Sequence, residues 1–113
     1  MRVRFLGKAG SINGDCPTLY TTERDTYLIQ GWRTESPDTV EIPHVLLGFL
    51  EADWFIATPL IDTGRGTFRV TGRPLTDPDT LNKLTIADDE AVIEVPMTRR
   101  NYYGATATEP ALA

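Results

Sequence analysis

The chain has 113 residues, of which 41% are hydrophobic and 24% are charged, and its formal net charge is −5 at pH 7. This composition predicts one globular domain with a single core and excludes a mainly disordered chain. No apolar run approaches the roughly 20 residues that cross a membrane, and the acidic balance disfavours a general affinity for nucleic acid. With no apolar leader after Met1 and a single cysteine, we expect a cytoplasmic protein.

The first half of the chain predicts four strands and a short helix. Its strands are rich in β-branched and aromatic residues. The turn Glu23-Arg24-Asp25 separates the second strand from the third, and Pro43 stops the fourth. The expected elements are strands over 3–6, 18–22, 26–32 and 39–42 and a helix over 44–50.

The second half predicts three strands and another short helix. Asp77 has the character of a helix N-cap, and Pro78 suits the first helical position. Pro96 is expected to stop the last strand, and the small, polar residues 104–113 are expected to form a flexible tail. The expected elements are strands over 55–61, 67–73 and 91–95 and a helix over 77–84.

The two halves resemble each other in sequence. Residues 19–40 match residues 60–81 at a constant offset of 41, and the match resumes after a twelve-residue insertion. The matched residues include Thr22 and Thr63, Arg24 and Arg65, Thr26 and Thr67, Gly31 and Gly72, Pro37-Asp38-Thr39 and Pro78-Asp79-Thr80, and finally Val40-Glu41-Ile42-Pro43 and Ile93-Glu94-Val95-Pro96. Composition alone predicts roughly one or two identities in such a stretch, so we infer an internal duplication.

These elements predict an α+β, mainly β fold. We expect one domain over residues 1–103, with about seven strands in two pseudo-symmetric halves, residues 18–50 and 59–103, and one or two short helices. A partly closed barrel or sandwich would protect the edge strands of so short a chain.

The sequence contains no readable catalytic set, so we expect a non-enzymatic protein without cofactor or metal. Cys16 and His44 are the only cysteine–histidine pair, but no local signature supports a nucleophile. Zinc would need more cysteine and histidine ligands than the chain supplies. The acids Asp77, Asp79, Asp88, Asp89 and Glu90 lack EF-hand spacing. The glycine-containing segment 63–67 has an acidic counterpart at 22–26, so we interpret it as a structural turn rather than a phosphate loop.

The two copies differ on one face of their repeated strand. Strand residues alternate faces, so Tyr27 and Ile29 should point into the core. The opposite face then carries Leu28, Gln30 and Trp32, where the second copy carries two arginines. Either another segment covers this face, such as strand 3–6 or helix 44–50, or it is exposed to a partner. Residues 34–64 contain six acids and no lysine or arginine, so the candidate partner site is Leu28, Gln30, Trp32, Glu35 and Asp53.

Several segments resemble elements of an uncharacterised family of small actinobacterial proteins. These segments are Phe5-Leu6-Gly7-Lys8, Cys16-Pro17-Thr18-Leu19-Tyr20, Tyr27-Leu28-Ile29-Gln30-Gly31-Trp32 and Ile93-Glu94-Val95-Pro96. Members of that family are often encoded beside Xre-type helix-turn-helix regulators. The resemblance implies an accessory role to a regulator and no particular site residues.

A second resemblance is to the swapped-hairpin barrels of AbrB/MazE-type DNA-binding proteins. It rests on Ile42-Pro43, which leads into a predicted helix. The basic residues that should follow this dipeptide are missing, and only Arg99-Arg100 follows the matching Pro96. This resemblance implies a DNA-binding homodimer, although the first half lacks the basic residues for the DNA contact.

Our leading hypothesis is therefore a non-catalytic protein-interaction module, accessory to a transcriptional regulator. The first alternative is a DNA-binding homodimer that uses Arg65, Arg69, Arg73, Arg99 and Arg100. The second is a small-ligand-binding protein or enzyme with a pocket between the halves.

Overall fold

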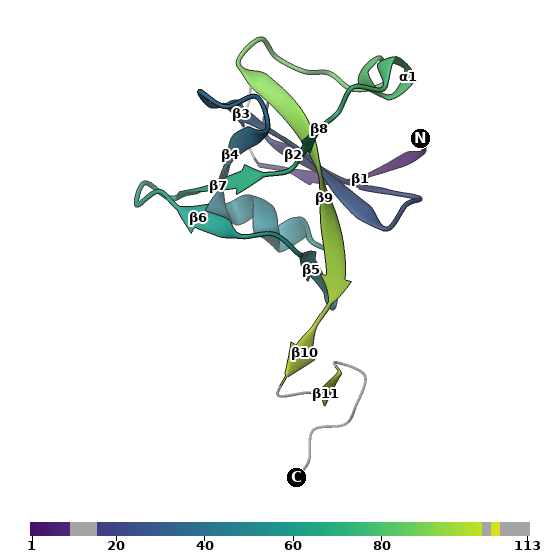
Figure 1. The fold of residues 1–113 in the computed structure, drawn as a ribbon, viewed down its shortest axis with the longest axis vertical. Coiled ribbons are helices and arrows are strands. Elements are labelled where there is room, and N and C mark those ends of the chain that lie inside the picture. The colour runs from purple at the N-terminus through teal and green to yellow at the C-terminus, as the bar shows by residue number, and fades with distance from the viewer. Residues whose placement is uncertain (10–15, 103–104, 107–113) are drawn as a thin grey trace.

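The computed structural model describes residues 1–9, 16–102 and 105–106 (Figure 1). Most of the expected tail, 104–113, lies outside these residues. The first half contains strands β1 (Val3–Lys8), β2 (Thr18–Thr22), β3 (Thr26–Arg33) and β4 (Thr39–Pro43), followed by the 3₁₀ helix η1 (His44–Phe49). The second half contains β5 (Trp54–Ile56), β6 (Leu60–Asp62), β7 (Thr67–Thr71), β8 (Arg73–Pro74), helix α1 (Pro78–Leu81), β9 (Glu90–Arg99), β10 (Asn101–Tyr102) and β11 (Ala105–Thr106).

The mainly β class and the two short helices are confirmed, but the described residues contain eleven strands rather than seven. Nine of them form one antiparallel sheet with the path β1-β2-β3-β4-β7-β6, and β9 pairs with β3, β5 and β8. The sheet does not close, because β1 and β6 each pair with a single neighbour. Strands β10 and β11 form a separate ladder beyond the end of β9 (Figure 1).

Strand pairing repeats at the spacing that the sequence predicts. In the hairpin β2–β3, Leu19 pairs with Ile29 and Tyr20 with Leu28. In the hairpin β6–β7, the pairs are Leu60 with Val70 and Ile61 with Arg69, each displaced by 41 residues. We call these the first and second hairpins.

Each hairpin also pairs with the third strand of the other half. On the first hairpin, β3 pairs with β9, so that Leu28 lies opposite Glu94. On the second hairpin, β7 pairs with β4, so that Arg69 lies opposite Glu41. Because Glu41 and Glu94 match in sequence, the two halves interlock in an equivalent way.

Two matched glycines allow this close packing. A Cβ atom on Gly31 would lie 2.8 Å from the carbonyl oxygen of Glu41, and one on Gly72 would lie 2.6 Å from that of Glu94. Real Cβ atoms do not approach backbone oxygens so closely. Both positions therefore require glycine for steric reasons.

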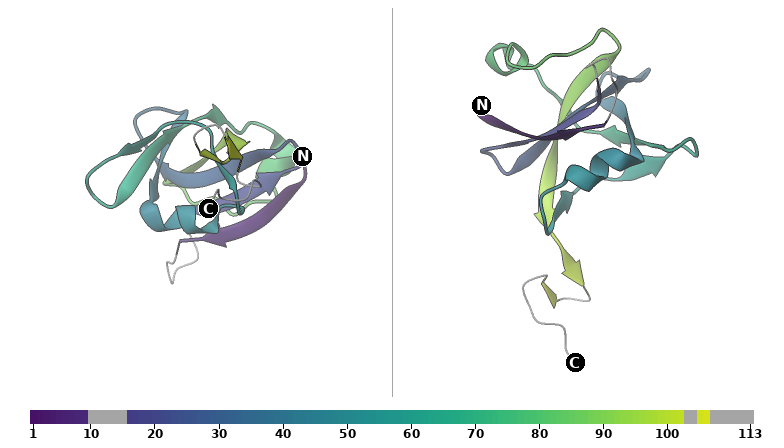
Figure 2. Two further views of the ribbon diagram at one scale, coloured as in Figure 1. Left: turned by 90° about the horizontal axis from the view of Figure 1, so that it is seen from below. Right: turned by 180° about the vertical axis from the view of Figure 1, so that it is seen from behind.

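The core lies between the inward faces of the two hairpins and their partner strands. Tyr27 and Ile29 are fully buried there, as predicted. They pack with Leu19, Val40, Ile42, Leu46, Ile56, Val70, Ile93 and Val95. Leu46 comes from η1, which lies beside β1 (Figure 2).

Three predicted boundaries are wrong. The strand expected over 55–61 is two strands, because β5 pairs with the end of β9 and β6 pairs with β7. The strand expected over 67–73 breaks at Gly72. Strand β9 does not stop at Pro96, because β9 changes neighbour there from β3 to β5. The Pro96 carbonyl still accepts a hydrogen bond from the Ala57 amide at 2.8 Å.

Both predicted helices are present, although each is short. At α1, the Asp77 carboxylate accepts hydrogen bonds from the Thr80 amide and hydroxyl, and Pro78 is the first helical residue. The expected helix over 44–50 is the 3₁₀ helix η1. Within residues 1–9, 16–102 and 105–106, no helix has the length and apolar character needed to cross a membrane.

Candidate functional site

The outer face of the first hairpin is buried, which corrects the expected partner site. This face consists of the side chains that point away from the core, and on β3 it carries Leu28, Gln30 and Trp32. Leu28 is 0% exposed and Gln30 is 1% exposed, so neither can contact a partner at the surface of this chain. Trp32 is only half-buried, on the strand between Glu41 and Glu90.

The cover comes from the segment between α1 and β9 together with strand β1, which is one of the two elements that the sequence suggested. The Gln30 amide donates to the Thr85 carbonyl oxygen and to the Glu90 carboxylate, each at 2.8 Å. The Tyr20 hydroxyl donates to the Gln30 side-chain oxygen at 3.2 Å. Strand β1 adds Phe5, whose ring meets that of Tyr20 edge-on at 6.2 Å.

Glu90 is a buried acid within this cover and is 0% exposed. Its Oε1 accepts from Gln30 and from the Ala87 amide, whereas Oε2 has no hydrogen-bond partner among the described residues. Burial raises the pKa of the neighbouring Tyr20 phenol, and the Glu90 charge raises it further against a lowering contribution from Thr18. The network fixes the segment 82–89 over the first hairpin.

The turns of the two hairpins carry matching polar clusters. The hydroxyls of Thr22 and Thr26 lie 2.6 Å apart, and so do those of Thr63 and Thr67. The left-handed backbone of Asp25 recurs at Gly66, 41 residues later. This equivalence supports the interpretation of segment 63–67 as a structural turn.

Each cluster binds a glutamate from the other half of the chain. Thr26 donates to Glu94 at 2.7 Å, and Thr67 donates to Glu41 at 2.6 Å. Arg65 lies 2.9 Å from Glu41, whereas its counterpart Arg24 lies 3.8 Å from Glu94. The Thr67 hydroxyl lowers the pKa of Glu41 below its ordinary value, with a further contribution from Arg65.

The second hairpin has an uncovered outer face. Ile61, the counterpart of Tyr20, is 59% exposed. Arg69, the counterpart of Leu28, reaches outward to Glu35 at 2.9 Å. A shallow groove of about 380 Å³ crosses this face and is lined by Thr39, Thr58, Pro59, Ile61, Arg69 and Thr71.

The first hairpin has an equivalent groove, but other segments of the chain enclose it on two sides. Thr18 and Tyr20 line it, and these residues match Pro59 and Ile61 of the second groove. Strand β1 supplies Val3, Phe5 and Lys8, and the segment after α1 supplies Lys83, Leu84 and Thr85. No described segment takes either place over the second hairpin.

The predicted acidic partner residues are each ion-paired with an arginine. Glu35 binds Arg69, and Asp53 lies 2.7 Å from Arg100. Neither acid extends an apolar patch with Leu28 or Gln30, since those side chains are buried. The five proposed site residues therefore do not form one surface.

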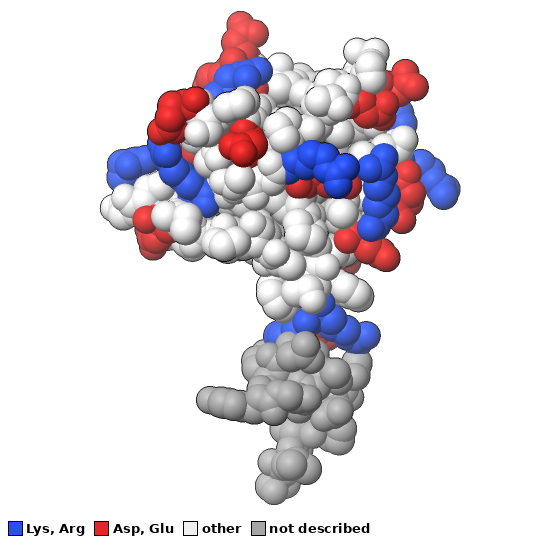
Figure 3. Space-filling view, viewed as in Figure 1, with Lys and Arg blue, Asp and Glu red and all other residues white. Residues whose placement is uncertain are grey.

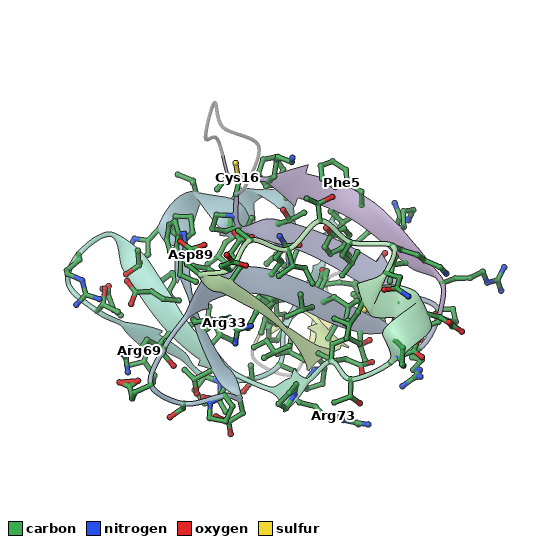
Figure 4. All side chains as sticks on the ribbon, turned by 90° about the horizontal axis from the view of Figure 1, so that it is seen from above. Phe5, Cys16, Arg33, Arg69, Arg73 and Asp89 are labelled. Carbon is green, nitrogen blue, oxygen red and sulfur yellow. The ribbon has the colours of Figure 1, made fainter. Side chains whose placement is uncertain are left out.

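The arginines proposed for a nucleic-acid contact do not gather into one basic patch. Arg65, Arg69 and Arg100 are each paired with a carboxylate. Arg69 and Arg73 lie on separate sides of the molecule (Figure 4), and basic and acidic side chains are interspersed on the face in Figure 3. Phosphate binding needs cations that are free to neutralise it, so this arrangement weakens the DNA-binding alternative.

The candidate catalytic residues occupy different environments. Cys16 is buried just before β2, whereas His44 on η1 stacks against Phe68 at 4.1 Å and lies 3.8 Å from Asp62. In the part of the chain that the structure describes, no three histidine, cysteine or acidic side chains gather as metal ligands do.

Sequence reasoning missed Ile61 and the edge of β6. The signal was present in the repeat, because β1 has no copy. The residues 41 positions after β1 form η1 instead of a strand. The duplication thus indicates a second hairpin that lacks an outer neighbour equivalent to β1.

No protein-family model matches the sequence, and no curated protein and no solved structure is similar to it. The pairing of its strands shows a mainly β fold with two interlocked halves. Its resemblance to the actinobacterial family stays a prediction.

Proposed function

We propose that the protein is a non-catalytic protein-interaction module that docks through the outer face and edge of the second hairpin. The observation that supports this proposal is the difference in cover between the two hairpins. In the first, β1 and segment 82–89 cover the outer face, and in the second the equivalent surface is bare around Ile61. This surface replaces Leu28 and Gln30 as the proposed contact.

The expected interaction is of moderate strength. Full burial of an isoleucine side chain contributes roughly 1.5–3 kcal/mol, and Ile61 has more than half of its surface left to bury. The groove beside it can take one further apolar side chain. Such a contact suits a reversible partner, and a helix-turn-helix regulator is the first candidate because of the family resemblance.

The test is affinity capture from the native host, with partners identified by mass spectrometry. We expect Ile61→Lys to lose a partner that the unaltered chain retains. Val45→Lys is the matched control, because Val45 is a similarly exposed apolar residue, 68% accessible, on η1. Equal capture by all three proteins would refute docking through the second hairpin.

A further inference from the structure

We propose that the occupant of the second hairpin is an extended segment of a partner, which adds to β6 as an antiparallel strand. This inference rests on the proposed function and names the partner's chemistry. It predicts a basic residue opposite Asp62, followed by an apolar or aromatic residue opposite Ile61. The pairing of β1 with β2 is a template for such a strand inside the same chain.

The backbone of β6 is oriented to accept a strand. The Thr63 amide donates to the Thr67 carbonyl oxygen at 3.1 Å, which makes these residues a hydrogen-bonded pair. Bonded pairs alternate along an antiparallel ladder, so Ile61 bonds to Arg69 while Leu60 and Asp62 direct their amides and carbonyls to the free edge. Within the described residues, no strand pairs with that edge.

The equivalent edge of β2 is already used. Strand β1 pairs there, with Arg4 opposite Thr21 and Phe5 opposite Tyr20. Transferring this register by 41 residues places an incoming residue opposite Asp62 where Arg4 stands, and another opposite Ile61 where Phe5 stands. Strand addition of this kind takes affinity from the backbone and specificity from alternate side chains.

The surroundings of β6 define the chemistry of those side chains. Asp62 is exposed, with 60% of its side chain accessible, and lies 3.8 Å from the His44 imidazole. A cross-strand partner of opposite charge is favourable by roughly 0.2–1 kcal/mol. The nearby Arg65 and Arg69 are already neutralised by Glu41 and Glu35. The local charge therefore favours a basic residue, and Ile61 with the groove favours an apolar one.

A second copy of the chain is a poorer occupant. Paired through β6, two copies would share only the three residues Leu60–Asp62 of each strand. A stable dimer buries about 800 Å² on each partner, which is far more than such a short edge offers. A longer extended segment can continue past the strand and reach the groove.

The probe is a synthetic peptide with the sequence of residues 1–8, because this sequence already fits the template register. We expect saturating peptide to slow hydrogen exchange of the Leu60 and Asp62 amides about tenfold, as measured by NMR on the full chain. Ile61→Lys should abolish this protection, whereas Val45→Lys should leave it intact. Asp62→Asn, which retains a side-chain oxygen for the Gly64 amide, should weaken peptide binding by about 1.5- to 5-fold.

Three outcomes would overturn the strand-addition proposal. The first is peptide binding that leaves the Leu60 and Asp62 amides unprotected, and the second is no binding at all. The third is a dimer in light scattering that Ile61→Lys converts to a monomer, since a second copy would then occupy the edge. The two proposals can fail separately. If Ile61→Lys loses the captured partner but the amides of β6 stay unprotected, strand addition is rejected and the proposed function is retained.

Discussion

The two hairpins have the same strand pairing and the same turn. The outer face of the first hairpin is buried, whereas the outer face of the second is exposed to solvent. Tyr20 and Leu28 on the first correspond to Ile61 and Arg69 on the second. Leu28 is fully buried, whereas Arg69 reaches outward to Glu35. Local structure is therefore preserved between the halves, while the environment of the outer face depends on whether another segment covers it.

The covering segments explain this difference. The twelve-residue insertion of the second half supplies segment 82–89, which follows α1 and lies over the hairpin of the first half. In Figure 4, Phe5 on β1 lies on the far side of the molecule from Arg69. An insertion in one half thus reduces the solvent exposure of the other half.

The largest expected effect is at Leu28. Leu28→Ser should destabilise the protein by about 3–5 kcal/mol, because it leaves a cavity and an additional buried hydroxyl. Arg69→Ser at the matched position should cost no more than about 1 kcal/mol, the usual limit for an exposed ion pair. Urea denaturation of both variants measures the contrast. Similar losses at the two positions would contradict the assigned difference in burial.

The matched glycines should respond alike. Gly31→Ala and Gly72→Ala should each cost about 2–3 kcal/mol, because the new Cβ atom meets a carbonyl oxygen of the partner strand. Thermal unfolding provides the measurement. Gly48→Ala serves as the control, because nothing lies within 4 Å of a Cβ at that position. If only one of the two substitutions left the stability unchanged, the packing of the two matched glycines would not be equivalent.

A smaller effect is expected at the turn clusters. Thr67→Val removes a hydrogen bond to the Glu41 carboxylate and should cost about 1 kcal/mol at neutral pH. The folded-state pKa of Glu41 is lowered, so its contribution is present above the ordinary glutamate range and is lost as the pH falls through the folded-state pKa.

The difference in unfolding free energy between wild type and Thr67→Val should therefore shrink on acidification. Denaturation at several pH values measures this change. Thr26→Val tests the matching contact with Glu94. A difference for Thr67→Val that grows towards low pH would have the wrong sign for a stabilised carboxylate.

The smallest effect is expected for DNA. Paired and dispersed arginines should give no band shift at low salt, whereas six phosphate contacts would give a log–log salt slope of roughly −5. A steep slope that Arg73→Ala and Arg99→Ala reduce would restore the DNA-binding alternative and would separate it from protein docking.

Much of the fold followed from residue pattern. The two-residue spacing of Tyr27 and Ile29 predicted the core face of β3, and the Asp77-Pro78 pair predicted the start of α1. Pro96 was misleading, since strand stopping was inferred from its missing amide alone. A change of partner strand at that point lets β9 continue, and no local pattern reveals such a change.

The sequence by itself determined that the two halves are related, where the hairpins turn and which side chains point inward, because turn chemistry and strand alternation are local properties. Only the tertiary structure decided which outer face is covered. That outcome depends on where segment 82–89 and β1 lie, through contacts between residues as distant as Gln30 and Glu90. Solvent exposure is a property of the assembled chain, so only the fold decides that Leu28 is buried and Ile61 is exposed.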